Sequence, residues 1–444
     1  MTKSPASPRP VRTGRYRYTK WRWRISVGLL DALGGLIVAL WGRLRPRAEA
    51  GPTRKILVVQ LDHMGDAILS SPIFPRLRAL YPGATIDVLA SPSNREVFEA
   101  DPEIDEVHLA DRNWFDRRPG RRALGSAVWA LGRSLRGRGY DLGIDVRGDV
   151  LTVFVLALAG IPRRLGWAMG GGGFLLTDVA DWVPGRHEVE SRLALLAKLD
   201  APADLPARVR VHATDRDRAR VARRLRDAWP VARAASRVPA RVGRKGTSDF
   251  RSHPNLPDDD APGWLHAGRF GEAAPMLAVH LGAGAAAKRW PARHWRELIG
   301  RFLQDGWRVV MVGGPDDVAT AATVAPHAGL RDWTGRLALA ETVALMERAD
   351  LFIGSDSGPA HLAASTALPS VILFSGTNRP RQWRPWSRRA LVLRQKVACR
   401  PCHHKACPLA DHPCMSGLAP DRVHRAALRW HARLRRAEVA HAPA

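Results

Sequence analysis

Two aspartates stand where an apolar strand gives way to an apolar helix, in the stretch LVVQLDHMGDAILSSP at residues 57–72. The second of them, Asp66, falls at the start of the expected helix. A carboxylate in that position can take part in chemistry, but it can also be a plain cap, because helix N-termini favour negative charge. On this stretch alone, both interpretations of Asp66 stay open.

Three later turns are candidates for binding an anionic ligand. Each contains glycine and leads from an expected strand toward a helix: residues 282–288, 313–316 and 355–361. Backbone N–H groups in such turns can approach a phosphate closely, and a helix N-terminus adds a favourable dipole. Lys288 supplies a positive charge beside the first of these turns. Taken singly, glycines at strand–helix turns are ordinary chain geometry.

Strands and helices alternate around these turns. Apolar strands are expected at KILVVQ, TIDVLAS and YDLGIDVRGD, with a helix at residues 66–80. The alternation restarts at MLAVHLGAG, residues 276–284, and continues to SVILFSG. This pattern predicts two doubly wound parallel sheets of the α/β class. Two such sheets in tandem usually bind ligand in the cleft between them, at the carboxyl ends of their strands.

The expected domains follow from where this alternation holds. Residues 51–229 form a first Rossmann-like domain, and residues 276–444 form a second one that ends in a cysteine cluster and a terminal helix. Between them, residues 230–275 are rich in Pro, Gly, Arg and Asp, which predicts a flexible linker or insertion.

Residues 1–50 form a basic, apolar segment ahead of the first domain. RYRYTKWRWR precedes the apolar residues 25–41, which contain Asp31 and are shorter than the roughly 20 apolar residues of a spanning helix. No small-residue cleavage site follows, so a signal peptide is not expected. Aromatic residues mixed with Arg and Lys suit an amphipathic helix that lies on an anionic membrane surface. An ordinary buried helix with a basic arm is the alternative.

The net charge of the chain indicates which classes of partner to expect. The 444 residues carry a formal net charge of +27, which suits phosphates, acidic lipids or nucleic acid. The Arg excess also lies in polar segments such as residues 216–226, where a solvated helix face explains it equally well. The core has no nucleic-acid recognition motif and no aromatic–basic platform, so nucleic acid is not an expected partner.

Four sequence motifs, taken together, resemble a known protein family, although each motif alone is a weak signal. LVVQLDHMGDAILSSPIFPRLRALYPGATIDVL, HLGAGAAAKRWPARHWREL, VVMVGGPDD and ADLFIGSDSGPAHLAAS closely resemble, in order and spacing, the lipopolysaccharide heptosyltransferases of glycosyltransferase family 9. The likeness runs from about Lys55 to Arg425 without the linker, and includes the tail CRPCHHKACPLADHPCM. It implies a GT-B fold: two Rossmann-like domains face a cleft, with the acceptor on the first and a nucleotide sugar on the second.

The resemblance gives Asp66 a chemical role. It implies a general base that removes a proton from the acceptor hydroxyl while that oxygen displaces the nucleotide from the anomeric carbon, which inverts this centre. Asp62 is then a turn residue, with an acceptor contact left open. The expected enzyme is an inverting glycosyltransferase that moves heptose from ADP-heptose to a lipopolysaccharide core or related glycolipid acceptor. An epimerase-like enzyme of the same fold and a non-catalytic sugar-nucleotide binder are the alternatives, and the DHMGD turn favours transfer.

On the donor side, the resemblance implies that Lys288 faces the donor phosphates and Asp356 the donor sugar. His361 lies just inside the following helix, where a structural histidine is the alternative interpretation. Asp316 stands where many members carry Glu, and its shorter side chain reaches less far toward the ribose or base. The expected donor-binding residues are Gly284, Lys288, Asp316, Asp356, Ser357, Gly358, Pro359 and His361.

No metal is expected in catalysis. The Asp-x-Asp patterns at residues 215–217 and 258–260 lie in a polar helix and in the linker, so Lys288 and helix dipoles are expected to replace a metal ion. The cysteines, which begin with a C-x2-C pair, are compatible with a structural zinc site or with free or disulfide-forming thiols. They are Cys399, Cys402, Cys407 and Cys414. The catalytic body is expected in the cytoplasm, peripheral on the inner face of the bacterial inner membrane.

Overall fold

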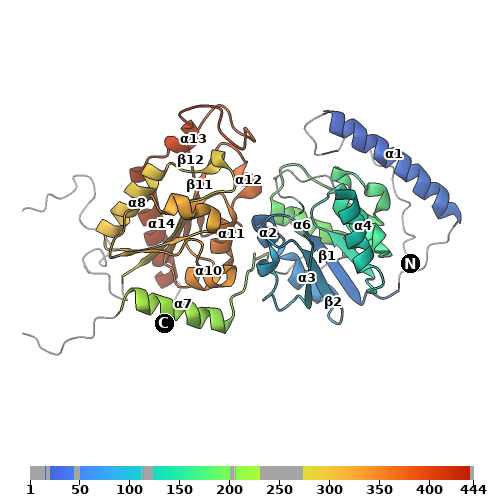
Figure 1. Ribbon diagram of the computed structural model, residues 1–444, viewed down its shortest axis with the longest axis horizontal. Helices are drawn as coiled ribbons and strands as arrows, with labels where there is room; N and C mark the ends of the chain where they lie inside the picture. Colours follow the sequence, from blue (N-terminus) through green and yellow to red (C-terminus); the bar gives the residue numbers. More distant parts are fainter. Residues whose placement is uncertain are drawn as a thin grey trace, which may run out of the picture. The chain divides into compact units, whose positions relative to one another are not determined.

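The computed structural model describes residues 16, 21–44, 51–111, 114, 124–200, 205, 207–230 and 274–440. The chain divides into two compact units, each with its own sheet (Figure 1). The first unit comprises Met1–His212, Ala364–Thr366 and Arg379–Ser387, and the second comprises Ala213–Ala363, Ala367–Asn378 and Arg388–Ala444. Nearly all of the expected linker at 230–275 lies outside the described residues.

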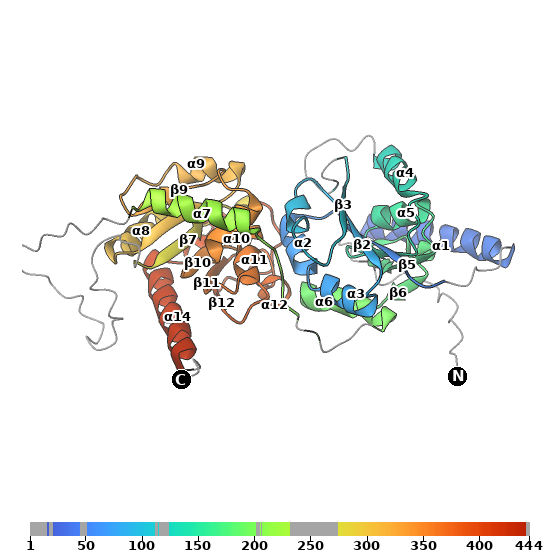
Figure 2. The same ribbon diagram turned by 90° about the horizontal axis from the view of Figure 1, so that it is seen from below.

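The first unit contains a six-stranded parallel sheet in the order β3-β2-β1-β4-β5-β6. The strands are β1 (Lys55–Gln60), β2 (Thr85–Ala90), β3 (Glu106–Leu109), β4 (Leu142–Asp145), β5 (Arg163–Trp167) and β6 (Asp178–Ala180). Strands β1, β2 and β4 are apolar and almost wholly buried, because helices cover both faces of the sheet (Figure 2).

The helices of this unit form two groups. Helices α3 (Ile73–Leu80) and α6 (Glu188–Leu196) pack together on one side, and α4 (Leu124–Leu135) and α5 (Val150–Leu158) pack together on the other (Figure 2). The expected helix at residues 66–80 is two helices, because α2 (Met64–Ser70) ends before α3 begins. Pro72 and Pro75 have no N–H to continue the first helix, so the chain restarts at Ile73.

Helix α1 (Trp21–Leu44) packs on the first unit through one face. The carboxylate of Asp31 accepts hydrogen bonds from the Tyr16 hydroxyl at 2.8 Å and from the backbone N–H of Gly172 at 2.7 Å. Gly34 lies so close to Phe174 that an added Cβ would meet the ring at 2.4 Å. Within the described residues, one helix is long and apolar enough to cross a membrane, by length and composition alone, and it is this one.

The second unit repeats the architecture with the order β12-β11-β10-β7-β8-β9, again parallel. The strands are β7 (Met276–His280), β8 (Arg308–Val312), β9 (Leu330–Asp332), β10 (Leu351–Ser355), β11 (Ser370–Phe374) and β12 (Ala390–Arg394). The helices of this unit are α7 (Asp215–Ala228), α8 (Ala292–Gln304), α9 (Val318–Ala321), α10 (Leu339–Met346), α11 (Gly358–Ser365), α13 (Pro413–Ser416) and α14 (Pro420–Ala440).

Helix α7 belongs to the second unit, whereas the sequence interpretation placed residues up to 229 in the first domain. It packs along α10, where Arg220 pairs with the buried Glu341 at 3.0 Å and Arg218 pairs with Glu347 at 2.8 Å. Two of the arginines in α7 therefore pair with acidic side chains on the neighbouring helix, so their presence does not require an anionic ligand.

Candidate active site

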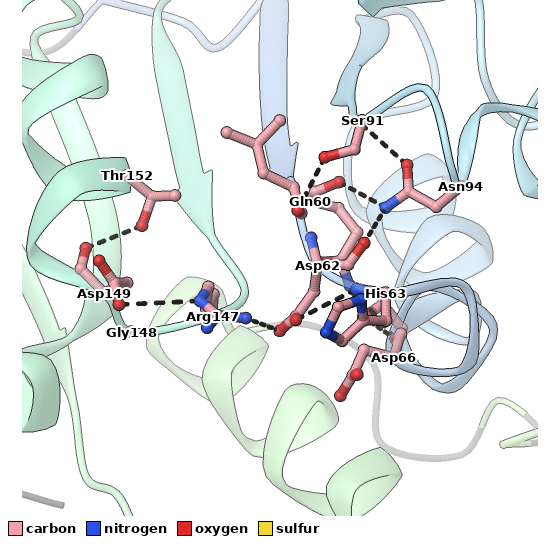
Figure 3. A network of polar contacts seen from close by, with 12 residues as sticks. Gln60, Asp62, His63, Asp66, Ser91, Asn94, Arg147, Gly148, Asp149 and Thr152 are labelled. Atoms are coloured by element: carbon pink, nitrogen blue, oxygen red, sulfur yellow. Dashed lines mark hydrogen bonds and ion pairs between the residues drawn. The ribbon is translucent and has the colours of Figure 1, made fainter. Parts of the chain in front are cut away.

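Asp66 lies in the first turn of α2, just after the turn that follows β1. The Nε2 group of Gln60 donates hydrogen bonds to the hydroxyl of Ser70 at 2.6 Å and to the backbone oxygen of Asp66 at 3.2 Å. The amide of Asn94 donates to the backbone oxygens of Gln60 and Asp62 at 3.0 and 2.7 Å (Figure 3). These bonds hold the strand, the turn and the helix together, so the position of Asp66 is fixed from both sides.

The carboxylate of Asp66 is only 18% exposed. Burial raises its pKa to about 7, and the nearby carboxylates of Asp62 and Glu188 act in the same direction. The guanidinium groups of Arg192 and Arg147 oppose this rise without cancelling it. A carboxyl group whose pKa lies near neutral pH is well matched to accepting a proton from a substrate at that pH.

Asp62 forms an ion pair with Arg147, which lies in the turn between β4 and α5 (Figure 3). The carboxylate of Asp145 holds that turn by accepting the backbone N–H groups of Arg147 and Gly148, both at 3.0 Å. Arg147 also lies 3.8 Å from Asp149. Asp62 is therefore more than a turn residue, because it brings a cation to within electrostatic range of Asp66.

Arg192, in α6, contacts two carboxylates at once. Its Nη1 donates to Oε2 of Glu188 at 2.7 Å, and its Nη2 lies 3.4 Å from Oδ1 of Asp66. The other oxygen of Glu188, Oε1, accepts a hydrogen bond from Gln382 at 2.8 Å. Gln382 lies in α12 (Pro380–Trp383), part of the late segment Arg379–Ser387 that belongs to the first unit. Both oxygens of Glu188 are thus engaged, and its position is fixed.

The second unit brings Lys288 and Asp356 together. Lys288 ends the 3-10 turn η7 (Ala286–Lys288) after β7, and its Nζ lies 2.7 Å from Oδ2 of Asp356. Asn378 donates to the same oxygen at 3.1 Å. The Asp356 side chain is 4% exposed, so this buried carboxylate is stabilised by one cation and one amide.

A second polar cluster in the same unit consists of His280, Asp317 and Ser357. Nε2 of His280 lies 3.0 Å from Oδ2 of Asp317, and Nδ1 lies 3.2 Å from the hydroxyl of Ser357. An added Cβ at Gly282 would lie 1.6 Å from Oδ1 of Asp317, and one at Gly313 would lie 2.7 Å from Oδ2. These two glycines therefore leave room for the Asp317 carboxylate, and not only for a ligand.

The other expected donor-side residues lie in different surroundings. Asp316 is exposed, and it is the neighbouring Asp317 that points toward His280. Gly284 is exposed, and an added Cβ there would meet nothing within 4 Å. Gly358 and Pro359 are half-buried at the start of α11, as is Ser357 before it. His361 is 4% exposed inside α11, a burial that also fits its structural interpretation.

The cysteine tail packs against the turns that carry these residues. The backbone oxygen of Lys405 accepts a hydrogen bond from the N–H of Ala287 at 2.9 Å, and Nε2 of His412 lies 3.0 Å from the oxygen of Ala287. Cys402 donates its N–H to the oxygen of Gly376 at 2.9 Å. All four cysteines are free thiols: Cys399, Cys402, Cys407 and Cys414. The tail thus supports the residue next to Lys288 and the loop that leads to Asn378.

The cysteines do not form a closed metal site in this structure. In the part of the chain that is described, one group has three ligand atoms within 4.8 Å of one another, and it consists of Asp87, Glu106 and His108. Asp87 also accepts a hydrogen bond from Tyr140 at 2.7 Å and lies 3.6 Å from Lys55. Its charge is therefore already balanced within the protein.

Seven charged or polar residues of these clusters were not predicted from the sequence: Arg147, Glu188, Arg192, His280, Asp317, Asn378 and Gln382. A positional signal existed for His280, because it is the last residue of β7 and lies at the carboxyl edge where ligands usually bind. Arg192 and Glu188 gave only the weak signal of an i,i+4 pair on a helix.

Comparison with known proteins agrees with this architecture. Residues 128–412 match the model of glycosyltransferase family 9 (heptosyltransferase). The chain is 26% identical over 380 residues to lipopolysaccharide heptosyltransferase 2 of Escherichia coli, covering 83% of this chain and 96% of that one. It is 27% identical over 358 residues to lipopolysaccharide heptosyltransferase 1 of Pseudomonas aeruginosa, covering 80% and 87%.

A solved structure of the E. coli ADP-heptose lipopolysaccharide heptosyltransferase II superposes with a TM-score of 0.62 at 23% identity, covering 86% of this chain and 99% of that chain. The family 9 glycosyltransferase of Veillonella parvula gives a TM-score of 0.64 at 20% identity, covering 87% and 99%. The predicted α/β fold of the GT-B class is thereby confirmed. The match to the family model spans more than half of this chain. The chain therefore belongs to glycosyltransferase family 9 and is a glycosyltransferase.

Proposed function

We propose that this enzyme transfers a heptose from ADP-heptose to a lipopolysaccharide core or related glycolipid acceptor, with inversion at the anomeric carbon. The observation that carries the proposal is Asp66: a mostly buried carboxylate, fixed in the first turn of α2, whose pKa is raised to about 7. The heptosyltransferase names of the relatives in E. coli and P. aeruginosa support the sugar and the acceptor class.

In this proposal the ionised carboxylate of Asp66 accepts the proton of an acceptor hydroxyl. The acceptor oxygen then forms a bond to the anomeric carbon on the face opposite the nucleotide. The bond from that carbon to the diphosphate breaks, and its electron pair stays on the phosphate oxygen. Because a neutral hydroxyl is a poor nucleophile, proton transfer to a positioned base typically contributes 100-fold or more to the rate.

On the donor side, Lys288 stabilises the negative charge that develops on the leaving diphosphate. Two of its three N–H donors face the side chain and backbone oxygens of Asp356 at 2.7 and 3.3 Å, which leaves one donor for a phosphate oxygen. Asp356 shares Oδ2 with Lys288 and Asn378 and offers Oδ1 to hydroxyl groups of the donor sugar.

We further propose that the transfer step needs no metal ion, because Lys288 and the backbone N–H groups before α11 supply the positive charge that a metal would give. Structural zinc at the four cysteines also stays a proposal. It rests on the C-x2-C spacing of Cys399 and Cys402 and on the position of the tail beside Ala287. Elemental analysis of the purified protein tests it.

The proposed site of action is the cytoplasmic surface of the inner membrane, which α1 would contact. Its docking through Asp31 leaves a set of large apolar side chains between 50% and 73% exposed. They are Trp21, Trp23, Ile25, Leu29, Leu33, Leu36, Ile37 and Leu40. Since Asp31 is hydrogen-bonded to the first unit, a helix lying on the headgroups fits better than one crossing the bilayer.

The test compares the wild type with Asp66→Asn. Both are incubated with ADP-heptose and a lipopolysaccharide core that lacks heptose, and the product is identified by mass spectrometry. The variant should bind ADP-heptose with unchanged affinity and transfer at least about 100-fold more slowly, because only the proton acceptor is lost.

Glu99→Gln is the matched control, because it makes the same change in the same unit on an exposed ion pair with Arg95. It should transfer at the wild-type rate. Turnover by Asp66→Asn within about tenfold of the wild type would remove the base assignment. Donor binding by the wild type without any transfer would instead favour a non-catalytic sugar-nucleotide binder.

A further inference from the structure

Helix α14 packs on the second unit through one face only. Val423 and Ala427 on this face are fully buried in the core, and the indole N–H of Trp430 donates to the backbone oxygen of Arg389 at 3.0 Å. Figure 2 shows the helix on the outside of the unit, with its last turns beyond the sheet. The opposite face of α14 is exposed to solvent.

This exposed face carries a row of arginines at intervals of three or four residues. Positions at that spacing lie on the same side of a helix, and each residue advances the helix by about 1.5 Å. The row is therefore straight and about 20 Å long. We call it the arginine stripe, and its members, all of them exposed, are Arg422, Arg425, Arg429, Arg433 and Arg436.

Most of the positive charge of the arginine stripe is not balanced within the protein. Helix α14 contains two acidic residues, Asp421 and Glu438. Asp421 pairs with Arg425 of the stripe, whereas Glu438 pairs with Arg389 outside it, at 2.7 Å. Among the described residues, no carboxylate lies within ion-pair distance of the last three members of the stripe, which are Arg429, Arg433 and Arg436.

A row of like charges is unfavourable for a helix in water. Like charges three or four residues apart destabilise a helix, and opposite charges at the same spacing stabilise it. Helix α7 has the stabilising arrangement, because Arg218 pairs with Asp215 on the same helix and with Glu347 on α10. The arginine stripe has few such partners, so an external anionic group would relieve its self-repulsion.

The length and composition of the arginine stripe indicate which anionic partner fits. A single phosphate reaches one or two neighbouring arginines, so a row of about 20 Å suits an extended anionic surface. The single Trp of the helix, Trp430, is half-buried with Arg433 over its ring at 5.7 Å, and α14 has no Asn or Gln. Base stacking and base reading are therefore disfavoured. Clusters of about four to eight basic residues on a helix are typical of contacts with anionic lipid headgroups.

We propose that the arginine stripe of α14 binds the anionic headgroups of a phospholipid bilayer, which gives the second unit a membrane contact of its own. The inference rests on the proposed function, which places a glycolipid acceptor at the membrane surface. This contact differs in kind from the one proposed for α1. Helix α1 exposes apolar side chains, whereas the stripe offers charge alone, so its binding should be sensitive to salt.

The experiment is co-sedimentation of the full chain with vesicles of phosphatidylglycerol and phosphatidylcholine. The triple variant Arg429→Gln, Arg433→Gln and Arg436→Gln keeps residues of good helix propensity and removes three charges. Each basic residue near such a surface strengthens binding about fivefold, so the variant should bind about 100-fold more weakly at low salt. The difference should disappear in about 1 M salt, where the Debye length is about 3 Å, and on vesicles of phosphatidylcholine alone.

The matched control removes three exposed arginines from α7 in the same unit, by Arg216→Gln, Arg223→Gln and Arg226→Gln. It should bind vesicles like the wild type. Both triple variants should transfer sugar to a soluble acceptor analogue at the wild-type rate, which checks that they fold.

The outcomes separate this inference from the proposed function. If the α14 variant binds anionic vesicles like the wild type, or if both variants lose the same affinity, the inference is wrong while the proposed transfer reaction stands. If the α14 variant loses affinity for a DNA duplex but not for vesicles, the partner is a nucleic acid and the inference is also wrong. If the wild type binds vesicles through the stripe but transfers no heptose, the inference stands and the proposed reaction fails.

Discussion

The Nη2 atom of Arg192 lies 3.4 Å from Oδ1 of Asp66. The other arm of the same guanidinium is closer to a second carboxylate, 2.7 Å from Glu188. One buried cation therefore serves two carboxylates, and Asp66 receives the weaker contact. This incomplete neutralisation, together with burial, keeps the pKa of Asp66 near 7 rather than near 4.

The first prediction concerns Glu188. If Asp66 is the proposed base, its ionised form is the active one, and kcat/KM of the wild type should rise with pH and level off above about 7. Glu188→Gln removes a negative charge that raises the pKa of Asp66 and lets Arg192 act on Asp66 alone. The rising limb should move to lower pH by about one unit, as is usual for a neighbouring charge. A pH profile of kcat/KM measures this shift.

Glu190→Gln is the control for this profile. Glu190 lies on the same helix but caps it, with its carboxylate 3.4 Å from the backbone N–H of His187. Its profile should coincide with that of the wild type. An unmoved limb in Glu188→Gln would show that Glu188 does not set the basicity of Asp66.

The second prediction concerns the stability of Asp66→Asn. An unfolded aspartate loses its proton near pH 4, whereas folded Asp66 loses it near pH 7. Between these values the folded state binds more protons, so the free energy of unfolding falls as pH rises. Asparagine does not ionise, so the free energy of unfolding of Asp66→Asn should not fall with pH in this way. At pH 8 it should exceed that of the wild type by on the order of 3 kcal/mol.

Urea unfolding at pH 4, 6 and 8 measures this difference, which should grow with pH and be smallest at pH 4. A difference that stays constant across this range would mean that Asp66 is ionised throughout. The pKa of Asp66 would then be normal despite the burial of its side chain.

The third prediction concerns the pair of Lys288 and Asp356. Lys288→Ala leaves a carboxylate that is 4% exposed with only Asn378 as a partner, and this should cost about 2–4 kcal/mol in the free energy of unfolding. Adding Asp356→Asn removes the uncompensated charge and should restore much of the loss. Denaturant unfolding of both single variants and the double variant measures the coupling. Additive losses would mean that the two groups do not stabilise each other.

The fourth prediction concerns the exposed face of α1. Leu33→Glu combined with Ile37→Glu places two charges on side chains that are 62% and 57% exposed, and should weaken binding to anionic vesicles. Transfer to a soluble acceptor analogue should not change. Vesicle co-sedimentation measures binding. The double variant Val318→Glu with Leu409→Glu makes the same charge change on the second unit and should bind vesicles like the wild type. An equal loss of vesicle binding in both double variants would mean that net charge alone determines the binding.

The fold could be predicted because strand and helix periods are strong signals in this chain. The parallel strands read as apolar runs, and the turns after them carry glycine or aspartate, so both sheets could be expected without a structure. The assignment of α7 could not be predicted in the same way. Its periodicity identifies a helix, but only the partners Glu341 and Glu347 on α10 decide which unit it joins.

The candidate site was predicted in part. The position of Asp66 in the first turn of a helix agrees with what the sequence suggested. The direct ion pair between Lys288 and Asp356 was not predicted. The pairing of Asp317 with His280 could not be predicted from the sequence, because it depends on the turn at Gly313 and on the space beside Gly282. Arg192 was missed because a salt bridge on one helix does not reveal a third partner from another helix.

The late segment Arg379–Ser387 has a consequence for protein engineering. It lies far along the chain, yet it supplies Gln382 to Glu188 and a backbone oxygen of Arg384 to His187, all within the first unit. No single cut can divide this chain into two self-sufficient halves. A hybrid that takes its second half from another family member would also import Gln382, which contacts the Glu188 partner of Arg192. Exchanging the second half would therefore change the surroundings of Asp66 in the first unit as well.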